Sequence, residues 1–122
     1  MGQKLAVVIT TPPYSNLTAT ALDYVESALN AGIEIVGVFF YQDGVLQANS
    51  NISIASDEFQ AIGQWQQLHR QYQLPLHLCI TAAEKRGLRD DLSPGNIHEV
   101  FTVSGLGELV ELTHQADRVV QL

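Results

Sequence analysis

The stretch LAVVITTPPYSNLTATALDYVESALNAGIEIVGVFF, residues 5–40, carries the pattern that decides the fold. Its first part, Leu5–Ile9, is a continuous run rich in β-branched residues, which is typical of a strand buried on both faces. Apolar residues then recur at helical spacing from Leu17 to Leu29, and Ile33–Phe40 is a second apolar run. A strand, a helix and a strand in this order predict a parallel βαβ unit.

The same alternation continues to the end of the chain. The elements expected after residue 40 are a long loop at Tyr41–Ser56, a helix at 59–72, a strand at Leu76–Ile80, a short helix at 82–86, a turn or loop at Leu88–Val100 with a helical turn near 97–100, a strand at Phe101–Val103, a helix at Leu106–Gln115 and a strand at Arg118–Leu122. The residues expected to begin or end the helices are Ser15 or Asn16, Gly32, Asp57 paired with Gln60, Thr81, Gly87 and Ser104. We therefore predict an α/β fold: one three-layer α/β/α domain over residues 1–122, with a mainly parallel sheet of four to five strands.

Composition restricts the class of protein. Apolar residues make up 46% of the 122 residues and charged residues 16%, which excludes a disordered tail or a coiled coil. Thirteen acidic against six basic residues give a net charge of -7, which repels phosphate backbones, so direct binding to nucleic acid is not expected. The apolar runs are short and Met1 to Thr10 lacks the apolar region of a signal peptide, so we expect a soluble cytoplasmic protein without membrane association.

Cys79 is the only cysteine, so an internal disulfide and a cluster of metal-binding thiolates are both excluded. It falls at the carboxyl end of an expected strand, where ligands and reactive groups gather in parallel sheets. Lys85, Arg86 and Arg89, half of the basic residues, follow within ten positions. Because a free thiol is only about 3% ionised at pH 7, nearby cations favour a reactive thiolate. The alternative is that Cys79 is a small buried hydrophobic residue.

His77 stands two residues before Cys79, so both side chains point to the same face of the expected sheet. A Cys-His dyad is one hypothesis, although the two side chains would lie roughly 6 to 7 Å apart along the strand. His69, His98 and His114 show no metal-ligand spacing and are interpreted as surface or loop residues.

Three other patterns have both a functional and a structural interpretation. The loop Thr10–Asn16 superficially resembles a phosphate or flavin cradle, but its two prolines and lack of glycine favour a structural loop. Gly105 and Gly107 form a lone Gly-x-Gly, which capping and close packing explain better than a dinucleotide site. The aromatic residues Phe59, Trp65 and Tyr72 are assigned to the core or a subunit interface, with Trp65 able to face a partner.

Four segments closely resemble the TusD/DsrE family of sulfur-relay proteins. They are FFYQDGVLQAN (39–49), ASDEFQAIGQWQQL (55–68), LPLHLCITAAEKRG (74–87) and FTVSGLGELVELTHQADRVV (101–120). The resemblance implies a DsrE-like fold and a sulfurtransferase in which Cys79 accepts sulfane sulfur as a persulfide, with Lys85, Arg86 and His77 as candidate support for its thiolate. The stretch Leu88–Val100 is expected to be shorter than its counterpart in the family, which bears on partner docking.

The resemblance also implies partners and a pathway. These are TusB-like and TusC-like subunits of the same fold in a heterohexamer, a TusA-like sulfur donor and a TusE-like acceptor, with 2-thiouridine at the tRNA wobble position as the end product. No metal or organic cofactor is implied, and the isolated chain is expected to form homo-oligomers. The alternatives are a DsrE-type carrier in sulfur oxidation, a non-catalytic scaffold subunit of the relay complex, and a small flavin- or nucleotide-binding module.

Overall fold

A five-stranded, wholly parallel sheet forms the centre of the computed structural model, which describes residues 3–91 and 95–122. Its strand order is β4-β3-β2-β1-β5. The strands are β1 (Lys4–Ile9), β2 (Glu34–Phe40), β3 (Leu76–Cys79), β4 (Thr102–Ser104) and β5 (Arg118–Gln121). The parallel sheet predicted from the alternating pattern is therefore confirmed.

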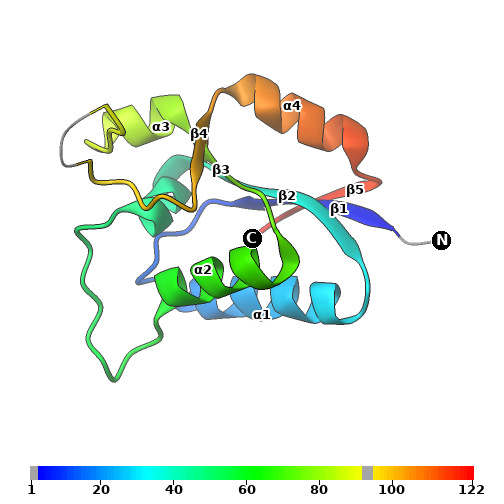
Figure 1. The fold of residues 1–122 in the computed structure, drawn as a ribbon, viewed down its shortest axis with the longest axis horizontal. Coiled ribbons are helices and arrows are strands. Elements are labelled where there is room, and N and C mark those ends of the chain that lie inside the picture. Colours follow the sequence, from blue (N-terminus) through cyan, green and yellow to red (C-terminus); the bar gives the residue numbers. More distant parts are fainter. Residues whose placement is uncertain (1–2, 92–94) are drawn as a thin grey trace.

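Helices cover the two faces of this sheet. The helices α1 (Asn16–Asn30) and α2 (Ala61–Tyr72) lie together on one side, whereas α3 (Ile80–Lys85) and α4 (Leu106–Gln115) lie on the other, as Figure 1 shows. This arrangement is the predicted α/β/α fold, and the bounds of α4 agree with those expected from the sequence.

Aromatic and β-branched side chains fill the core between the sheet and the α1–α2 layer. Phe40, at the end of β2, makes edge-to-face contacts with Trp65 and Phe101, with ring centroids 5.1 and 5.2 Å apart. Trp65 is fully buried, so it is a core residue and does not face a partner in this structure. Phe59, which the sequence assigns with Trp65 to the core or a subunit interface, precedes α2 and is exposed, so it is not a core residue.

The residues predicted to cap the helices are partly correct. Ser15 does cap α1, because its hydroxyl accepts a hydrogen bond from the Leu17 N–H at 3.2 Å. The capping box of Asp57 and Gln60 is wrong: Gln60 occupies the cap position of α2 without a side-chain cap bond. Its amide nitrogen donates instead to backbone carbonyls of the preceding loop, including that of Ala55 at 2.8 Å.

Two further cap predictions fail because strand and helix meet without a loop. Thr81 lies inside α3, which begins at Ile80 with Cys79 in the cap position. Ser104 is the last residue of β4, and Gly105 caps α4. The close packing expected at Gly105 and Gly107 is also wrong, since a Cβ at either position would meet no atom within 4 Å.

The expected long loop at Tyr41–Ser56 contains a short 3-10 helix, η1 (Gln42–Ala48). Its interior residue Gln47 is fully buried. The Gln47 amide donates to the Thr11 carbonyl at 2.9 Å and the Thr18 hydroxyl at 3.1 Å, and its oxygen accepts from the indole N–H of Trp65 at 3.2 Å. One polar side chain in η1 therefore joins the loop after β1, α1 and α2. The hydropathy pattern did not predict this ordered structure, because the stretch lacks a regular apolar period.

The second expected loop, Leu88–Val100, runs beside η1 where the structure describes it. An antiparallel bridge joins Asn49 to Ile97, and the Phe101 N–H closes a turn on the His98 carbonyl. Residues 92–94 of the turn or loop predicted at Leu88–Val100 lie outside the described residues. None of the helices within residues 3–91 and 95–122 combines the length and the apolar character needed to cross a membrane.

The close packing of Gly44 in η1 against the Ile9 backbone can be tested by substitution. A Cβ on Gly44 would lie 2.0 Å from the Ile9 carbonyl oxygen, so Gly44→Ala must displace backbone. We expect Gly44→Ala to lower the free energy of unfolding by about 3 kcal/mol or more. The matched control is Gly63→Ala in α2, where a Cβ meets no atom within 4 Å. This change should raise stability by about 1 kcal/mol, and urea unfolding of both variants measures the contrast.

Candidate functional site

Cys79 occupies the junction of β3 and α3. It is the last residue of the strand and the cap residue of the helix at once, and it pairs with Ser104 of β4 in the parallel register. The prediction that Cys79 lies at the carboxyl end of a strand is confirmed. Its side chain is only 1% exposed, so the thiol is not freely presented to solvent.

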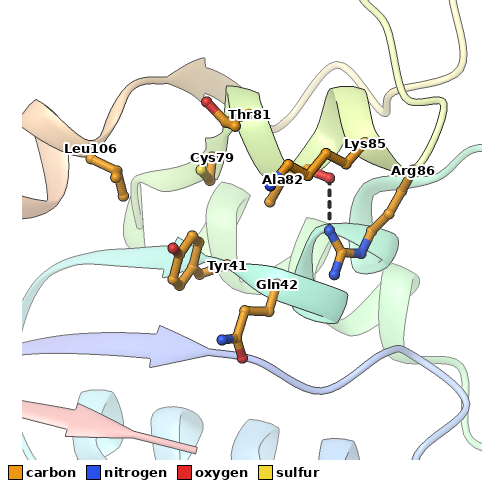
Figure 2. A pocket seen from close by; sticks show the side chains of 8 residues that line it. All are labelled: Tyr41, Gln42, Cys79, Thr81, Ala82, Lys85, Arg86 and Leu106. Atoms are coloured by element: carbon orange, nitrogen blue, oxygen red, sulfur yellow. Dashed lines mark hydrogen bonds between the residues drawn. The ribbon is translucent and has the colours of Figure 1, made fainter.

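The thiol nevertheless lines a pocket of about 290 Å³. The residues around it come from the end of β2, η1, α3 and the start of α4: Tyr41, Gln42, Cys79, Thr81, Ala82, Lys85, Arg86 and Leu106. Figure 2 shows Cys79 and Ala82 on one wall, Tyr41 and Gln42 on the facing wall, and Leu106 at the side. The pocket gives the buried sulfur a route toward the surface.

The two cations predicted to support Cys79 are both at this pocket, but they differ in their partners. Arg86 Nε donates to the Asp43 carboxylate at 2.9 Å, and its guanidinium also donates to the Ala82 carbonyl at 3.0 Å. Arg86 therefore fastens α3 to η1. Lys85 forms no ion pair within the described ranges 3–91 and 95–122, so its charge remains available to an anion in the pocket.

Arg89, the third cation near Cys79 in sequence, does not belong to this pocket. It forms a two-pronged contact with Asp91, at 2.9 and 2.6 Å, and lines a separate pocket of about 240 Å³. The hydrogen bond from Arg89 lowers the pKa of Asp91, and the same bond raises the pKa of Arg89. These two exposed charges neutralise one another away from the thiol.

His77 shares the strand with Cys79 but bonds to another side chain. Its Nδ1 lies 3.2 Å from the Ser104 hydroxyl, and the histidine does not line the pocket of Cys79. The structure therefore shows no direct dyad between the two residues. The sequence predicted Ser104 as a helix cap and not as a partner of His77. Its place beside His77 depends on the β3–β4 register, which a single sequence does not give.

Several polar groups of the loop Thr10–Asn16 form hydrogen bonds within the protein, whereas the buried Thr11 hydroxyl has no partner among the described residues. The Ser15 hydroxyl caps α1, and the Thr18 hydroxyl donates to the Pro12 carbonyl at 2.7 Å. These bonds match the structural interpretation of the loop.

Across residues 3–91 and 95–122, no three histidine, cysteine or acidic side chains come together in a way that could hold a metal ion.

Tyr41, Gln42 and Leu106 are pocket residues that the sequence reasoning missed. Tyr41 and Gln42 directly follow β2, and Leu106 follows β4 after one residue. The carboxyl ends of parallel strands meet at one edge of a sheet, so the rule that located Cys79 also identifies these residues once the strand bounds are known.

The fold and the site together define a class: a parallel α/β protein with one cysteine where a central strand turns directly into a helix. A model of the DsrE/DsrF-like family matches residues 3–122, and the chain belongs to this family. The resemblance stated from the sequence is therefore confirmed.

Two relatives and one solved structure show how close the kinship is. Sulfurtransferase TusD of Salmonella arizonae is 39% identical and that of Salmonella paratyphi B 40% identical, each over 97% of this chain and 98% of the relative. This identity over nearly full length supports sulfurtransferase activity. The crystal structure of the ychN protein from E. coli covers 100% of both chains with a TM-score of 0.70, and at 21% identity it shows the shared fold.

The position of Leu106 leads to a prediction about access to the sulfur. Leu106 lines the pocket and is 49% exposed, so its removal should open the route to Cys79 with little loss of core. We expect Leu106→Ala to speed alkylation of Cys79 by iodoacetamide roughly 3-fold or more. Val110→Ala is the control, because Val110 lies on the same helix, is 53% exposed and does not line the pocket. Equal rates in the two variants would contradict the assigned route.

Proposed function

We propose that this chain carries sulfane sulfur as a persulfide on Cys79 and relays it between proteins, for 2-thiouridine formation at the tRNA wobble position. The observation that carries the proposal is the placement of the single described thiol at the carboxyl edge of the sheet, on a pocket with an uncommitted lysine. Kinship with proteins named sulfurtransferase TusD supports the same chemistry.

The proposed exchange needs one ionised sulfur and no further reagent. The Cys79 thiolate attacks the outer sulfur of a donor persulfide, a new sulfur–sulfur bond forms at Cys79, and the donor leaves as a thiolate that takes up a proton. Delivery to the acceptor reverses these roles. One sulfur–sulfur bond replaces another at each step, so no metal or organic cofactor takes part.

Electrostatic support for the sulfur anion comes chiefly from Lys85 in this proposal. The helix α3 has only six residues, which limits the contribution of its dipole. Arg86 is already paired with Asp43 and acts mainly by holding α3 against η1. Lys85 is exposed, so water and salt reduce its effect, and a contribution below about 1 kcal/mol is expected.

The proposed partners are proteins and not the tRNA itself. TusB-like and TusC-like subunits of the same fold would complete a heterohexamer, a TusA-like protein would supply sulfur and a TusE-like protein would receive it. The net charge of -7 supports this division, because an acidic chain meets protein carriers more readily than a phosphate backbone. This pathway places the protein in the cytoplasm, where tRNA is modified. A DsrE-type role in sulfur oxidation would use the same exchange with other partners.

A second candidate function follows from the burial of the thiol. At 1% exposure, Cys79 fits a scaffold subunit whose cysteine packs in the core and never reacts. The pocket at its side favours the carrier over the scaffold. The two candidates are separated by alkylating the assembled native complex: a carrier reacts before denaturation, whereas a scaffold reacts only after it.

Sulfur loading tests the proposal directly. The protein is incubated with a cysteine desulfurase, cysteine and a TusA-like donor, and its intact mass is then measured without reductant. We expect the wild-type chain to gain one sulfur atom and Cys79→Ser to gain none, because Cys79 is the only cysteine. An equal gain in Cys79→Ser, or no gain in the wild type, would reject the carrier role.

Removing the uncommitted charge should slow this loading without preventing it. We expect Lys85→Gln to reduce the initial loading rate about 2- to 5-fold at low ionic strength, with a smaller difference in high salt. Lys4→Gln is the matched control, because Lys4 begins β1 and does not line the pocket. A loss of the same size in both variants would show that net charge, and not the position of Lys85, sets the rate.

A further inference from the structure

Cys79, Ser104 and His77 lie together on the face of the sheet covered by α4. Cys79 pairs with Ser104 in the β3–β4 register, two residues further along both strands than the pair of His77 with Thr102. His77 and Cys79 are two residues apart, so their side chains share a face. The 3.2 Å contact between His77 Nδ1 and the Ser104 hydroxyl places Ser104 on that face as well.

This placement brings a hydroxyl that contacts a base next to the residue that carries the thiol. Residues paired across neighbouring strands lie about 4.8 Å apart, so the Ser104 side chain stands beside that of Cys79. His77 is roughly 6 to 7 Å from Cys79 along the strand, too far for a direct hydrogen bond. Ser104 already contacts His77, and its hydroxyl also lies 3.5 Å from the Thr102 carbonyl. The structure records no hydrogen bond between this hydroxyl and Cys79, so the proposed route requires the Ser104 side chain to rotate toward the sulfur.

We infer that His77 accepts, through the Ser104 hydroxyl, the proton that Cys79 gives up when it is loaded with sulfur. The inference rests on the carrier function proposed above. The Cys79 thiol is 1% exposed and reaches the surface only through its pocket, so a group beside it inside the protein is better placed than bulk solvent to take its proton. His77 is half-buried, and imidazole is the side chain whose ordinary pKa suits proton exchange near pH 7.

The proton movements balance with the exchange of sulfur. The Cys79 proton passes to the Ser104 oxygen while the Ser104 proton passes to His77 Nδ1, which leaves a thiolate and an imidazolium. The thiolate attacks the outer sulfur of the donor persulfide, and the donor thiolate departs with the electron pair of the broken bond. The departing donor thiolate takes up one proton and the imidazolium gives one up through the Ser104 hydroxyl, so the protons balance. One sulfur–sulfur bond replaces another, so there is no net oxidation. His77 is therefore a positioning residue that acts through Ser104.

Other titratable groups near His77 are few in the described part of the chain. Across the sheet, Phe39 and Thr102 pair with His77, and neither titrates. From α4, Leu112 packs over this part of the sheet, and half-buried Glu108 lies one turn before it. The titratable groups that line the pocket of Cys79 are Tyr41, Lys85 and Arg86. Glu108→Gln therefore serves as a control for the carboxylate on α4.

The test compares sulfur loading and iodoacetamide alkylation over a range of pH in five variants. They are His77→Asn, which keeps an acceptor near the Nδ1 position but takes no proton; Ser104→Ala; Ser104→Thr, which keeps the hydroxyl; Thr102→Ala; and Glu108→Gln. At pH 7 we expect His77→Asn and Ser104→Ala to load sulfur at least about 10-fold more slowly than wild type. The other three should stay within about 2-fold. At about pH 9 both slow variants should recover, since a free thiol ionises without a base there.

The pH at which alkylation reaches half of its maximal rate should rise by the same amount in His77→Asn and in Ser104→Ala. A merely structural role would not give rescue at high pH or by Ser104→Thr. Loading within 2-fold of wild type in both variants at pH 7, or a deficit that persists unchanged at about pH 9, would overturn the inference. If the wild-type chain takes up no sulfur, the carrier function fails, whereas unshifted alkylation profiles refute the proton route independently.

Discussion

The direct passage from β3 into α3 is the constraint on which the site depends. Because no loop separates the two elements, Cys79 is held by the β3–β4 register on one side and by the first turn of a helix on the other. The backbone at this point has little freedom, so the sulfur cannot move far to meet a partner. Access must instead come from the surrounding side chains, among which Leu106 is a large apolar residue that is 49% exposed.

The opposite wall of the pocket depends on polar bonds in the interior. Gln47 fixes η1 to the loop after β1, to α1 and to α2, and Gly44 permits η1 to lie against the end of β1. These contacts position the start of η1, where Gln42 lines the pocket. The Arg86–Asp43 ion pair joins η1 to α3 across the same space. The buried hydrogen bonds of Gln47 and the Arg86–Asp43 ion pair thus hold in place two of the elements that form the pocket of the thiol.

The sequence predicted the elements that hydrophobic periodicity defines and missed those that depend on specific polar contacts. The parallel sheet, the bounds of α4 and the strand-end position of Cys79 all followed from apolar patterns. The 3-10 helix was missed because its buried residues, Gly44, Val45, Gln47 and Ala48, include a glycine and a glutamine and follow no regular apolar period. Thr81 and Ser104 were wrongly assigned as caps because local capping preferences ignore strand pairing, which placed Ser104 in β4 and beside His77.

The burial of the sulfur is consistent with the energetics of its proposed task. Sulfane exchange replaces one sulfur–sulfur bond by another, so it has little intrinsic driving force and its direction must be set by which partner gains access. A persulfide held open to solvent would also react with oxidants and stray thiols. A thiol that is almost fully buried, but next to a pocket with one uncommitted cation, limits exchange to a partner that can place its own sulfur in that pocket. Selectivity in such a relay therefore resides in the walls of the pocket, above all in Leu106, Tyr41 and Lys85, more than in the reactivity of the cysteine alone.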